Sequence, residues 1–193
     1  MMKNSQTPVF TAITFDPATN SRLMTVINNL DSYAEALACH PEPEVRLHLT
    51  LNYRPFVGPV EPLIERLSAL DLPSFDLCLR KPGLFKNKDR DVIWMDVDRD
   101  LEALVFLREA AEREFESMGY PGGTGIYRPH ITLAYAKEAK LLSRAKDIFP
   151  ADEDTAFTVT AFHLFREVKD DHGIHFDLIH TFPLKAKTGE TDG

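Results

Sequence analysis

Residues 46–53 of this sequence read Arg-Leu-His-Leu-Thr-Leu-Asn-Tyr, and residues 128–135 read Arg-Pro-His-Ile-Thr-Leu-Ala-Tyr. Arginine, histidine, threonine, leucine and tyrosine recur in the same order, each 82 positions later (46 to 128). Apolar residues alternate with polar ones in both stretches, a pattern that predicts β-strands with one buried face. The two stretches are therefore interpreted as equivalent strands of a duplicated unit.

Side chains alternate between the two faces of a strand, so residues two apart project together. One face of each strand is expected to be polar: Arg46, His48, Thr50 and Asn52 on the first strand, and Arg128, His130 and Thr132 on the second. The leucines between them, together with Ile131, are expected to be buried. A pseudo-twofold arrangement would bring the two polar rows together around one cleft.

The repeat continues outside these two strands. Phe75 and Phe157 begin apolar runs that are 82 positions apart, and Phe10 falls opposite Val92 at the same spacing. Strands are predicted over residues 9–15, 46–53, 75–79, 92–97, 127–135, 157–166 and 174–182. Helices are predicted after Asp16, over 63–70, over 100–119 and over 141–149, with a polar loop over 81–91.

The predicted organisation is a single domain over residues 1–193, built from two strand-helix-strand-helix-strand halves at about 8–81 and 90–184. The halves would pack about a pseudo-twofold axis, with equivalent strands beside each other. Residues 185–193 are polar and are predicted to be a disordered tail.

Composition narrows the class of protein. The 193 residues are 44% hydrophobic and 27% charged, which is typical of a globular domain. No apolar run reaches the ~20 residues of a membrane span, and no signal peptide is expected at the N-terminus. The net charge of −8 disfavours bulk, non-specific nucleic-acid binding. Cys39 and Cys78 fit a reducing interior, and we expect a cytoplasmic monomer that contacts no membrane.

The two polar rows suit chemistry at phosphorus. Because histidine titrates near pH 6.5, one imidazole can act as a general base while the other acts as a general acid. Threonine hydroxyls can donate hydrogen bonds to phosphate oxygens, and arginine adds positive charge. His48 and His130 are therefore the candidate catalytic residues for an in-line displacement at phosphorus. Two alternatives stay open: a module that binds a phosphorylated nucleotide without turnover, and a metal-dependent hydrolase built from the histidines.

Two His-x-Thr motifs in a duplicated small protein resemble the 2H phosphoesterase superfamily, specifically its LigT-like branch of 2′-5′ RNA ligases and RNA 2′,3′-cyclic phosphodiesterases. Residues 83–95 and 162–184 are similar to the family's segment between the motifs and to its final hairpin. The resemblance implies an α+β fold, with two mainly antiparallel sheets flanking a central cleft and helices on the outside. It also implies catalysis without metal or cofactor on a small nucleotide or RNA end that carries a 2′,3′-cyclic phosphate or a 2′-5′ linkage.

The resemblance also assigns roles to residues. It implies that His48 is the acid for the leaving 3′ oxygen and that His130 is the base for water. The candidate substrate-binding residues are Thr50, Thr132, Arg128, Arg46, Phe85 and Tyr135. Some relatives have arginine where this chain has Tyr135, so either Arg128 takes over a phosphate contact or the substrate differs.

Aromatic residues near the motifs have two possible roles. Phe85 precedes Lys86 in a polar segment, and it is expected either to stack on a base or to pack into the core. For Trp94, Tyr53 and Tyr135, packing is the expected alternative to a role in binding.

Overall fold

The strands that carry the two His-x-Thr motifs are neighbours at the centre of one curved antiparallel sheet. The computed structural model describes residues 7–31, 40–41, 46–123, 125–136, 155–171 and 173–187. Its strands are β1 (Thr7–Ile13), β2 (His40–Pro41), β3 (Leu49–Val57), β4 (Phe75–Phe85), β5 (Asp91–Arg99), β6 (His130–Ala136), β7 (Thr155–Val159), β8 (Ala161–Asp170) and β9 (Gly173–Pro183). Their order in the sheet is β7-β4-β5-β6-β3-β1-β8-β9, and the short β2 pairs with β6.

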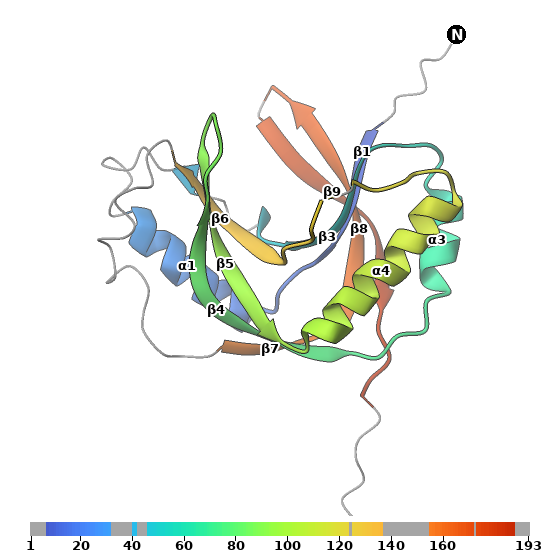
Figure 1. The fold of residues 1–193 in the computed structure, drawn as a ribbon, viewed down its shortest axis with the longest axis horizontal. Helices are drawn as coiled ribbons and strands as arrows, with labels where there is room; N and C mark the ends of the chain where they lie inside the picture. Colours follow the sequence, from blue (N-terminus) through green and yellow to red (C-terminus); the bar gives the residue numbers. More distant parts are fainter. Residues whose placement is uncertain are drawn as a thin grey trace, which may run out of the picture.

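The α+β fold was predicted correctly, but the described strands form one sheet where two were expected. The two strands that contain the motif threonines meet where Leu49 of β3 pairs with Ile131 of β6. This pairing satisfies backbone groups that two separate sheets would leave open at their edges. In addition, β7 pairs with β4 and leads into β8 after one residue, Thr160, so the sheet curls. The β4–β5 and β8–β9 hairpins therefore project from the same side of the molecule (Figure 1).

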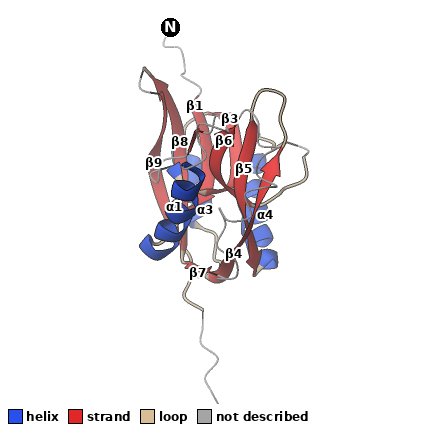
Figure 2. Ribbon diagram, turned by 90° about the vertical axis from the view of Figure 1, so that its left-hand side faces the viewer, coloured by secondary structure: helices blue, strands red, loops and turns tan. Residues whose placement is uncertain are grey.

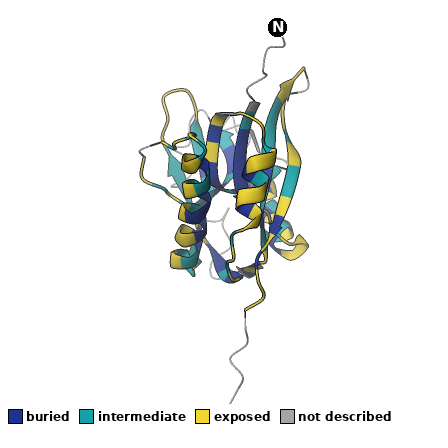
Figure 3. Cartoon of the chain, turned by 90° about the vertical axis from the view of Figure 1, so that its right-hand side faces the viewer, coloured by how far each residue is buried: buried dark blue, intermediate teal, exposed yellow. Residues whose placement is uncertain are grey.

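Helices α1 (Pro17–Asp31), α3 (Glu61–Ser68) and α4 (Leu101–Ser117) lie on the outside of the sheet, as predicted. α1 packs against β6 and β7, α4 packs against β3 and β4, and α3 packs against α4 and β9. Each helix turns an apolar stripe inward, for example Leu23 and Ile27 on α1, and Leu107 and Phe115 on α4. The helices flank the strands in Figure 2, and their outer faces are exposed while the central strands are buried in Figure 3.

Local chemistry sets the helix ends. The side chain of Asp16 accepts a hydrogen bond of 2.7 Å from the backbone N–H of Thr19, and Pro17 occupies the first position of α1. α4 is closed by Gly119, whose φ of +82° suits glycine. The next backbone N–H, that of Tyr120, donates to the carbonyl of α4 residue Phe115 at 3.0 Å.

The prediction of a polar loop over residues 81–91 is wrong for the first half of that segment. After an irregularity between Leu79 and Pro82, β4 resumes its pairing with β5 and continues through Phe85. Backbone pairing with a neighbouring strand therefore outweighs the turn preference of the polar residues, and the connection shortens to residues 86–90.

The C-terminal segment keeps backbone contacts beyond the predicted start of the tail. Lys185 bridges to Pro73, and its backbone N–H donates to the carbonyl of Leu72 at 2.9 Å. Residues 188–193 and the helix predicted over 141–149 lie outside the described residues. None of the helices that the structure describes has the length and apolar character needed to span a bilayer.

Candidate active site

A β-bulge decides which side chains of β3 face the site. Thr11 on β1 pairs with Asn52, and Ala12 pairs with Thr50, so Leu51 is an extra residue on β3. An extra residue interrupts the alternation of faces along a strand. Beyond Leu51, strict alternation therefore predicts the wrong face of the sheet for each side chain of β3.

Asn52 is the residue whose predicted position is wrong. It was expected beside His48, but it lies on the opposite face, is 3% exposed, and bonds to α4 and to the hydroxyl of Thr11. Tyr53 takes the position on the site face: it pairs with Phe10, whose ring lies 5.0 Å from the ring of His48.

β6 has a bulge at the equivalent position. The register of β5 with β6 shifts between Ile93 and Trp94, which leaves Leu133 as the extra residue, 82 positions after its counterpart on β3. Tyr135 is thereby turned to the site face, as Tyr53 is. The two halves thus share an irregularity as well as a motif.

The contact between β3 and β6 brings the two motifs together. Leu49 pairs with Ile131, so each histidine stands opposite the threonine of the other motif. Directly opposed residues in such a pair have Cβ atoms about 4.5–5.5 Å apart, and diagonal ones about 7–8 Å. His48 and His130 are diagonal neighbours on one face of the sheet. The pairing therefore places the two motifs at adjacent positions on one face of the sheet.

The two imidazoles are held in the same way. Nδ1 of His48 lies 2.6 Å from the carbonyl oxygen of Arg46, and Nδ1 of His130 lies 2.7 Å from that of Arg128. A carbonyl oxygen can only accept, so Nδ1 carries a proton and donates in both rings. Nε2 is then the ring atom left to take up or release a proton in a reaction.

Burial lowers the pKa of His48 below its ordinary value of 6.5. The hydrogen bond to the carbonyl of Arg46 opposes this shift, while repulsion from His130 and from the Arg46 side chain adds to it. The net direction favours a neutral imidazole at pH 7.

Phenylalanine rings from distant strands pack against His48. The ring centroids of Phe10 on β1 and Phe176 on β9 lie 5.0 and 5.2 Å from that of His48. Sequence reasoning did not identify either residue, because only strand pairing brings β1 and β9 close to β3. No local motif marks them.

Phe85 and Trp94 pack on the side of His130. The ring of Phe85 lies 4.9 Å from that of His130 and nearly perpendicular to it, at 86°. Phe85 also stacks on Trp94, with centroids 4.7 Å apart, and Trp94 lies 6.3 Å from His130. Phe85 is half-buried and lies against both rings, outside the hydrophobic core.

The remaining predicted residues lie at the edges of this region. Nη1 of Arg46 donates to the carbonyl of Ile174 on β9 at 3.4 Å, which ties it to the β8–β9 hairpin. The ring of Tyr135 lies beneath the guanidinium of Arg90, 4.0 Å from its central carbon. Arg128 is exposed and borders a cavity.

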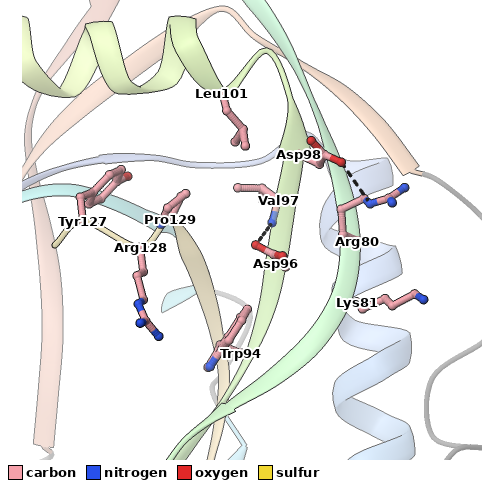
Figure 4. Close-up of a pocket in the computed structure, with 10 residues that line it drawn as sticks. All are labelled: Arg80, Lys81, Trp94, Asp96, Val97, Asp98, Leu101, Tyr127, Arg128 and Pro129. Carbon is pink, nitrogen blue, oxygen red and sulfur yellow. Dashed lines mark hydrogen bonds and ion pairs between the residues drawn. The ribbon is translucent and has the colours of Figure 1, made fainter.

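That cavity has a volume of about 590 Å³ and is shown in Figure 4. Its walls include Arg80, Lys81, Trp94, Asp96, Tyr127 and Arg128. Asp96 on β5 pairs directly with His130 on β6, so the cavity and the histidines belong to neighbouring positions of the same sheet face. The site therefore combines a pair of histidines with an adjoining space large enough for a small organic ligand.

Comparison with known proteins identifies the family. The model of the 2′-5′ RNA ligase superfamily matches residues 20–171, a span that contains both motifs. This chain belongs to that superfamily. The resemblance to the 2H phosphoesterases seen in the sequence is confirmed.

Known proteins share sequence or fold with this chain. It is 36% identical to an RNA 2′,3′-cyclic phosphodiesterase of Aeropyrum pernix over 101 residues, which are 49% of this chain and 56% of the relative. E. coli LigT complexed with 3′-AMP superposes with a TM-score of 0.77 at 21% identity, covering 93% of this chain and 99% of that one. A Thermus thermophilus protein superposes with a TM-score of 0.73 at 22% identity and the same coverage. These two structural similarities show that this chain has the same fold as those two proteins.

A buried polar network joins β3 to α4 in this superfamily member. Arg54 on β3, 4% exposed, forms an ion pair with Glu112 of α4. Its Nε donates to the carbonyl of Tyr120 at 2.7 Å, and its guanidinium lies 4.8 Å over the ring of Phe115. These contacts satisfy a buried charge and hold α4 against β3, the strand that begins directly after His48.

A second contact links the two motif segments. The hydroxyl of Tyr127 donates to the carbonyl of Thr50 at 2.9 Å. Burial raises the pKa of Tyr127 above its usual value of 10, so the hydroxyl keeps the proton it donates. The segment before β6 is therefore anchored to β3.

Metal-ligating side chains do not cluster in the part of the chain that the structure describes. Within those ranges, no three histidine, cysteine, aspartate or glutamate side chains gather in a way that could hold an ion. Cys39 and His172 lie outside those ranges.

Proposed function

We propose that this protein is a phosphodiesterase that opens 2′,3′-cyclic phosphates at RNA or nucleotide ends, or cleaves 2′-5′ linkages, without a metal ion. The pairing of Leu49 with Ile131 is the main support for the proposal, because strands in that register have the two His-x-Thr motifs as neighbours. The name of the Aeropyrum pernix relative supports the reaction class. The 3′-AMP held by E. coli LigT supports a nucleotide ligand.

The proposed reaction is an in-line displacement at phosphorus. The phosphate lies between the motifs, and the hydroxyls of Thr50 and Thr132 donate to its non-bridging oxygens. Neutral Nε2 of one histidine takes a proton from water as the new P–O bond forms. The other histidine gives a proton to the ribose 3′ oxygen as its bond to phosphorus breaks. The product carries a 2′-phosphate and a free 3′ hydroxyl, and each proton transfer contributes about 10²–10⁴-fold.

The roles of the two histidines follow the resemblance, with His48 as the acid and His130 as the base. Burial favours the neutral form of His48 in the free protein, which is the wrong form for an acid. A bound phosphate anion beside Nε2 favours the protonated form. Substrate binding therefore has to raise the pKa of His48 before it can protonate the leaving oxygen.

Incubation with 2′,3′-cyclic nucleoside monophosphates in the presence of EDTA tests the proposal. Release of nucleoside 2′-monophosphate at a rate that EDTA does not change supports a metal-independent enzyme. Binding of the cyclic nucleotide without any product would instead identify a binding module. Loss of turnover with EDTA and its recovery with added metal would identify a metal-dependent hydrolase.

The cell compartment and the oligomeric state belong to the proposal as well. The thiol of Cys78 is free and buried, which suits the reducing cytoplasm expected from the sequence. We propose that the protein acts there as a monomer on small nucleotides or RNA ends.

A further inference from the structure

The β4–β5 hairpin concentrates positive charge on an acidic protein. Residues 80–90 contain five basic residues and one acidic residue, whereas the whole chain has a net charge of −8. Lys86, Lys88 and Arg90 lie in the connection at the tip of the hairpin, and all three are exposed. Among the described residues, no carboxylate forms an ion pair with any of these three side chains. The tip therefore carries positive charge that the protein does not neutralise by pairing.

The tip begins and ends beside the candidate site. Phe85, the last residue of β4, packs against the ring of His130 at 4.9 Å, and Lys86 follows it in the chain. Phe85 also pairs with Val92 on β5, which pairs in turn with Tyr135 on β6. The basic connection therefore leaves the sheet at the level of Tyr135, on the strand that contains the second motif.

Arg90 is held over the ring of Tyr135. The central carbon of its guanidinium lies 4.0 Å from the ring centroid. Stacking occupies a face of the planar guanidinium and leaves the N–H donors at its rim for an anion. No residue within the described ranges accepts a hydrogen bond from Arg90. A positioned guanidinium of this kind is suited to a phosphate, which can accept two parallel hydrogen bonds from it.

The other hairpin that borders the site has the opposite charge. The β8–β9 hairpin projects from the same side of the molecule (Figure 1), and its Phe176 packs beside His48 as Phe85 packs beside His130. Between residues 167 and 177 the sequence has four acidic residues and one basic residue, Lys169. A polyanion that leaves the site is therefore attracted by one hairpin and repelled by the other.

A single nucleotide does not use the basic tip. Tyr135 lies five positions after His130, a backbone span of roughly 15 Å at the rise of an extended strand. A 2′,3′-cyclic mononucleotide has one phosphorus atom, which the proposed reaction places between the histidines. An RNA strand instead has further phosphates on the 5′ side of its cyclic end. These phosphates match the charge and the position of the tip.

We propose that the tip of the β4–β5 hairpin binds the phosphodiester backbone of an RNA strand whose cyclic-phosphate end is held by the histidines. Arg90, Lys86 and Lys88 contact phosphates on the 5′ side of the reacting end, and the strand runs away from the β8–β9 hairpin. The inference rests on the proposed function for the reacting end. It adds that the enzyme prefers a polynucleotide end to a mononucleotide, independently of base sequence, because backbone contacts do not read bases.

Hydrolysis of substrates of different length tests this preference. The substrates are an RNA octamer and a mononucleotide that carry the same 2′,3′-cyclic nucleotide, compared at one ionic strength. We expect kcat/KM to be about tenfold higher for the octamer, because three exposed charge contacts add to the binding of its backbone. Equal values of kcat/KM would overturn the proposal.

Charge-neutral variants locate the contacts. Arg90→Gln, Lys86→Gln and Lys88→Gln, combined in one protein, remove the charges and keep polar side chains. The ratio of kcat/KM for the octamer to kcat/KM for the mononucleotide should fall about tenfold. Lys169→Gln, at an exposed lysine of the other hairpin, is the matched control and should keep the wild-type ratio. If the triple variant lowers kcat/KM equally for both substrates, the three side chains act on the reacting phosphate and the proposal is wrong.

Equilibrium binding measures the same contacts without turnover. A labelled RNA octamer with a 3′-terminal phosphate is titrated at several salt concentrations and followed by fluorescence anisotropy. The logarithm of the association constant should fall with the logarithm of salt concentration by about 0.7 for each phosphate contacted, so the triple variant should lose about 2 from this slope. Equal slopes for the wild type and the triple variant would overturn the backbone contact. Equal displacement of the octamer by polyglutamate and by unlabelled RNA would assign the tip to an acidic protein segment instead.

The outcomes distinguish the two proposals. If the wild-type protein hydrolyses no cyclic phosphate but binds the octamer more tightly than the triple variant does, the hairpin contact stands and the proposed reaction fails. If cyclic phosphates are hydrolysed with the same kcat/KM at every length, the proposed reaction stands and the hairpin contact fails.

Discussion

Leu49 on β3 pairs with Ile131 on β6, and these residues are 82 positions apart, the same spacing that separates His48 from His130. Residues related by a repeat can pair with each other only where a local twofold axis passes between them. The same relation recurs where β4 pairs with β7. There Asp76 pairs with Thr158, which follows it by 82 positions in the chain. There the hydroxyl of Thr158 donates to the carboxylate of Asp76 at 2.7 Å. The twofold relation, proposed here for the two halves, explains why both histidines reach one site.

Replacing either candidate catalytic histidine is expected to stop turnover without unfolding the protein. His48→Ala or His130→Ala removes one proton-transfer group, so kcat should fall by about 10²–10⁴-fold. Hydrolysis of a cyclic nucleotide is followed for each variant, with circular dichroism to check folding. His175→Ala, at an exposed position of β9, is the control and should keep its activity. Near-normal activity of both active-site variants would contradict the assignment.

The threonine hydroxyls are expected to act mainly on the reacting phosphate. Thr50→Val and Thr132→Val preserve the shape of a strand residue and remove the donor, so kcat/KM should fall by about 10²-fold. Thr158→Val is a matched control at the far end of the sheet, and it should leave kcat/KM unchanged. An unchanged kcat/KM in both site variants would mean that these hydroxyls do not contact the substrate.

The lowered pKa of His48 predicts how folding stability depends on pH. In the unfolded chain this histidine titrates near 6.5, whereas in the folded protein it binds a proton only at lower pH. Between those two pKa values the unfolded state binds more protons, so the free energy of unfolding should fall as pH drops below about 6.5. Above that pH both states hold a neutral ring, and this contribution is constant.

Urea unfolding between pH 5 and 8 measures this effect. His48→Asn removes the titrating group, so its free energy of unfolding should vary less with pH than that of the wild type. His163, whose pKa burial also lowers, is still present in this variant and leaves part of the slope. Identical slopes for both proteins would show that His48 titrates alike in the folded and unfolded states.

The buried ion pair behind the site is expected to matter for stability. Glu112→Ala leaves the charge of Arg54 buried without its partner, which should lower the free energy of unfolding by about 3–5 kcal/mol. Glu114→Ala on the same helix is the matched control: its ion pair with Arg66, at 3.3 Å, is more exposed and contributes about 0.2–1 kcal/mol. Chemical denaturation measures the free energy of unfolding of both variants. Equal decreases for Glu112→Ala and Glu114→Ala would contradict a larger contribution of the buried pair.

Much of the fold could be predicted because its cues are local. The alternation in residues 46–53 and 128–135 indicated two strands, and the capping residues Asp16 and Gly119 marked helix ends. The register of the repeat also predicted that His48 and His130 belong to equivalent strands. These features depend on residues within a few positions of one another, or on an identity of pattern that needs no coordinates.

Other parts of the site could not be predicted, because they depend on which strands become neighbours. The bulge at Leu51 turned Asn52 away from the face that alternation assigned to it, and its cause is the register with β1 rather than the sequence of β3. Phe176 reaches His48 from β9, in the other half of the chain. The order of strands decides such contacts.

The sequence by itself determined the chemistry available to this protein: two imidazoles, two hydroxyls and a pattern that puts each pair on one face of a strand. Only the tertiary structure decided that the strands join one sheet at Leu49 and Ile131, and that Trp94 and Asp96 line the same cavity. The physical reason is that side-chain alternation is a local consequence of backbone geometry. Strand order and cavities instead follow from how all the elements bury their apolar faces together.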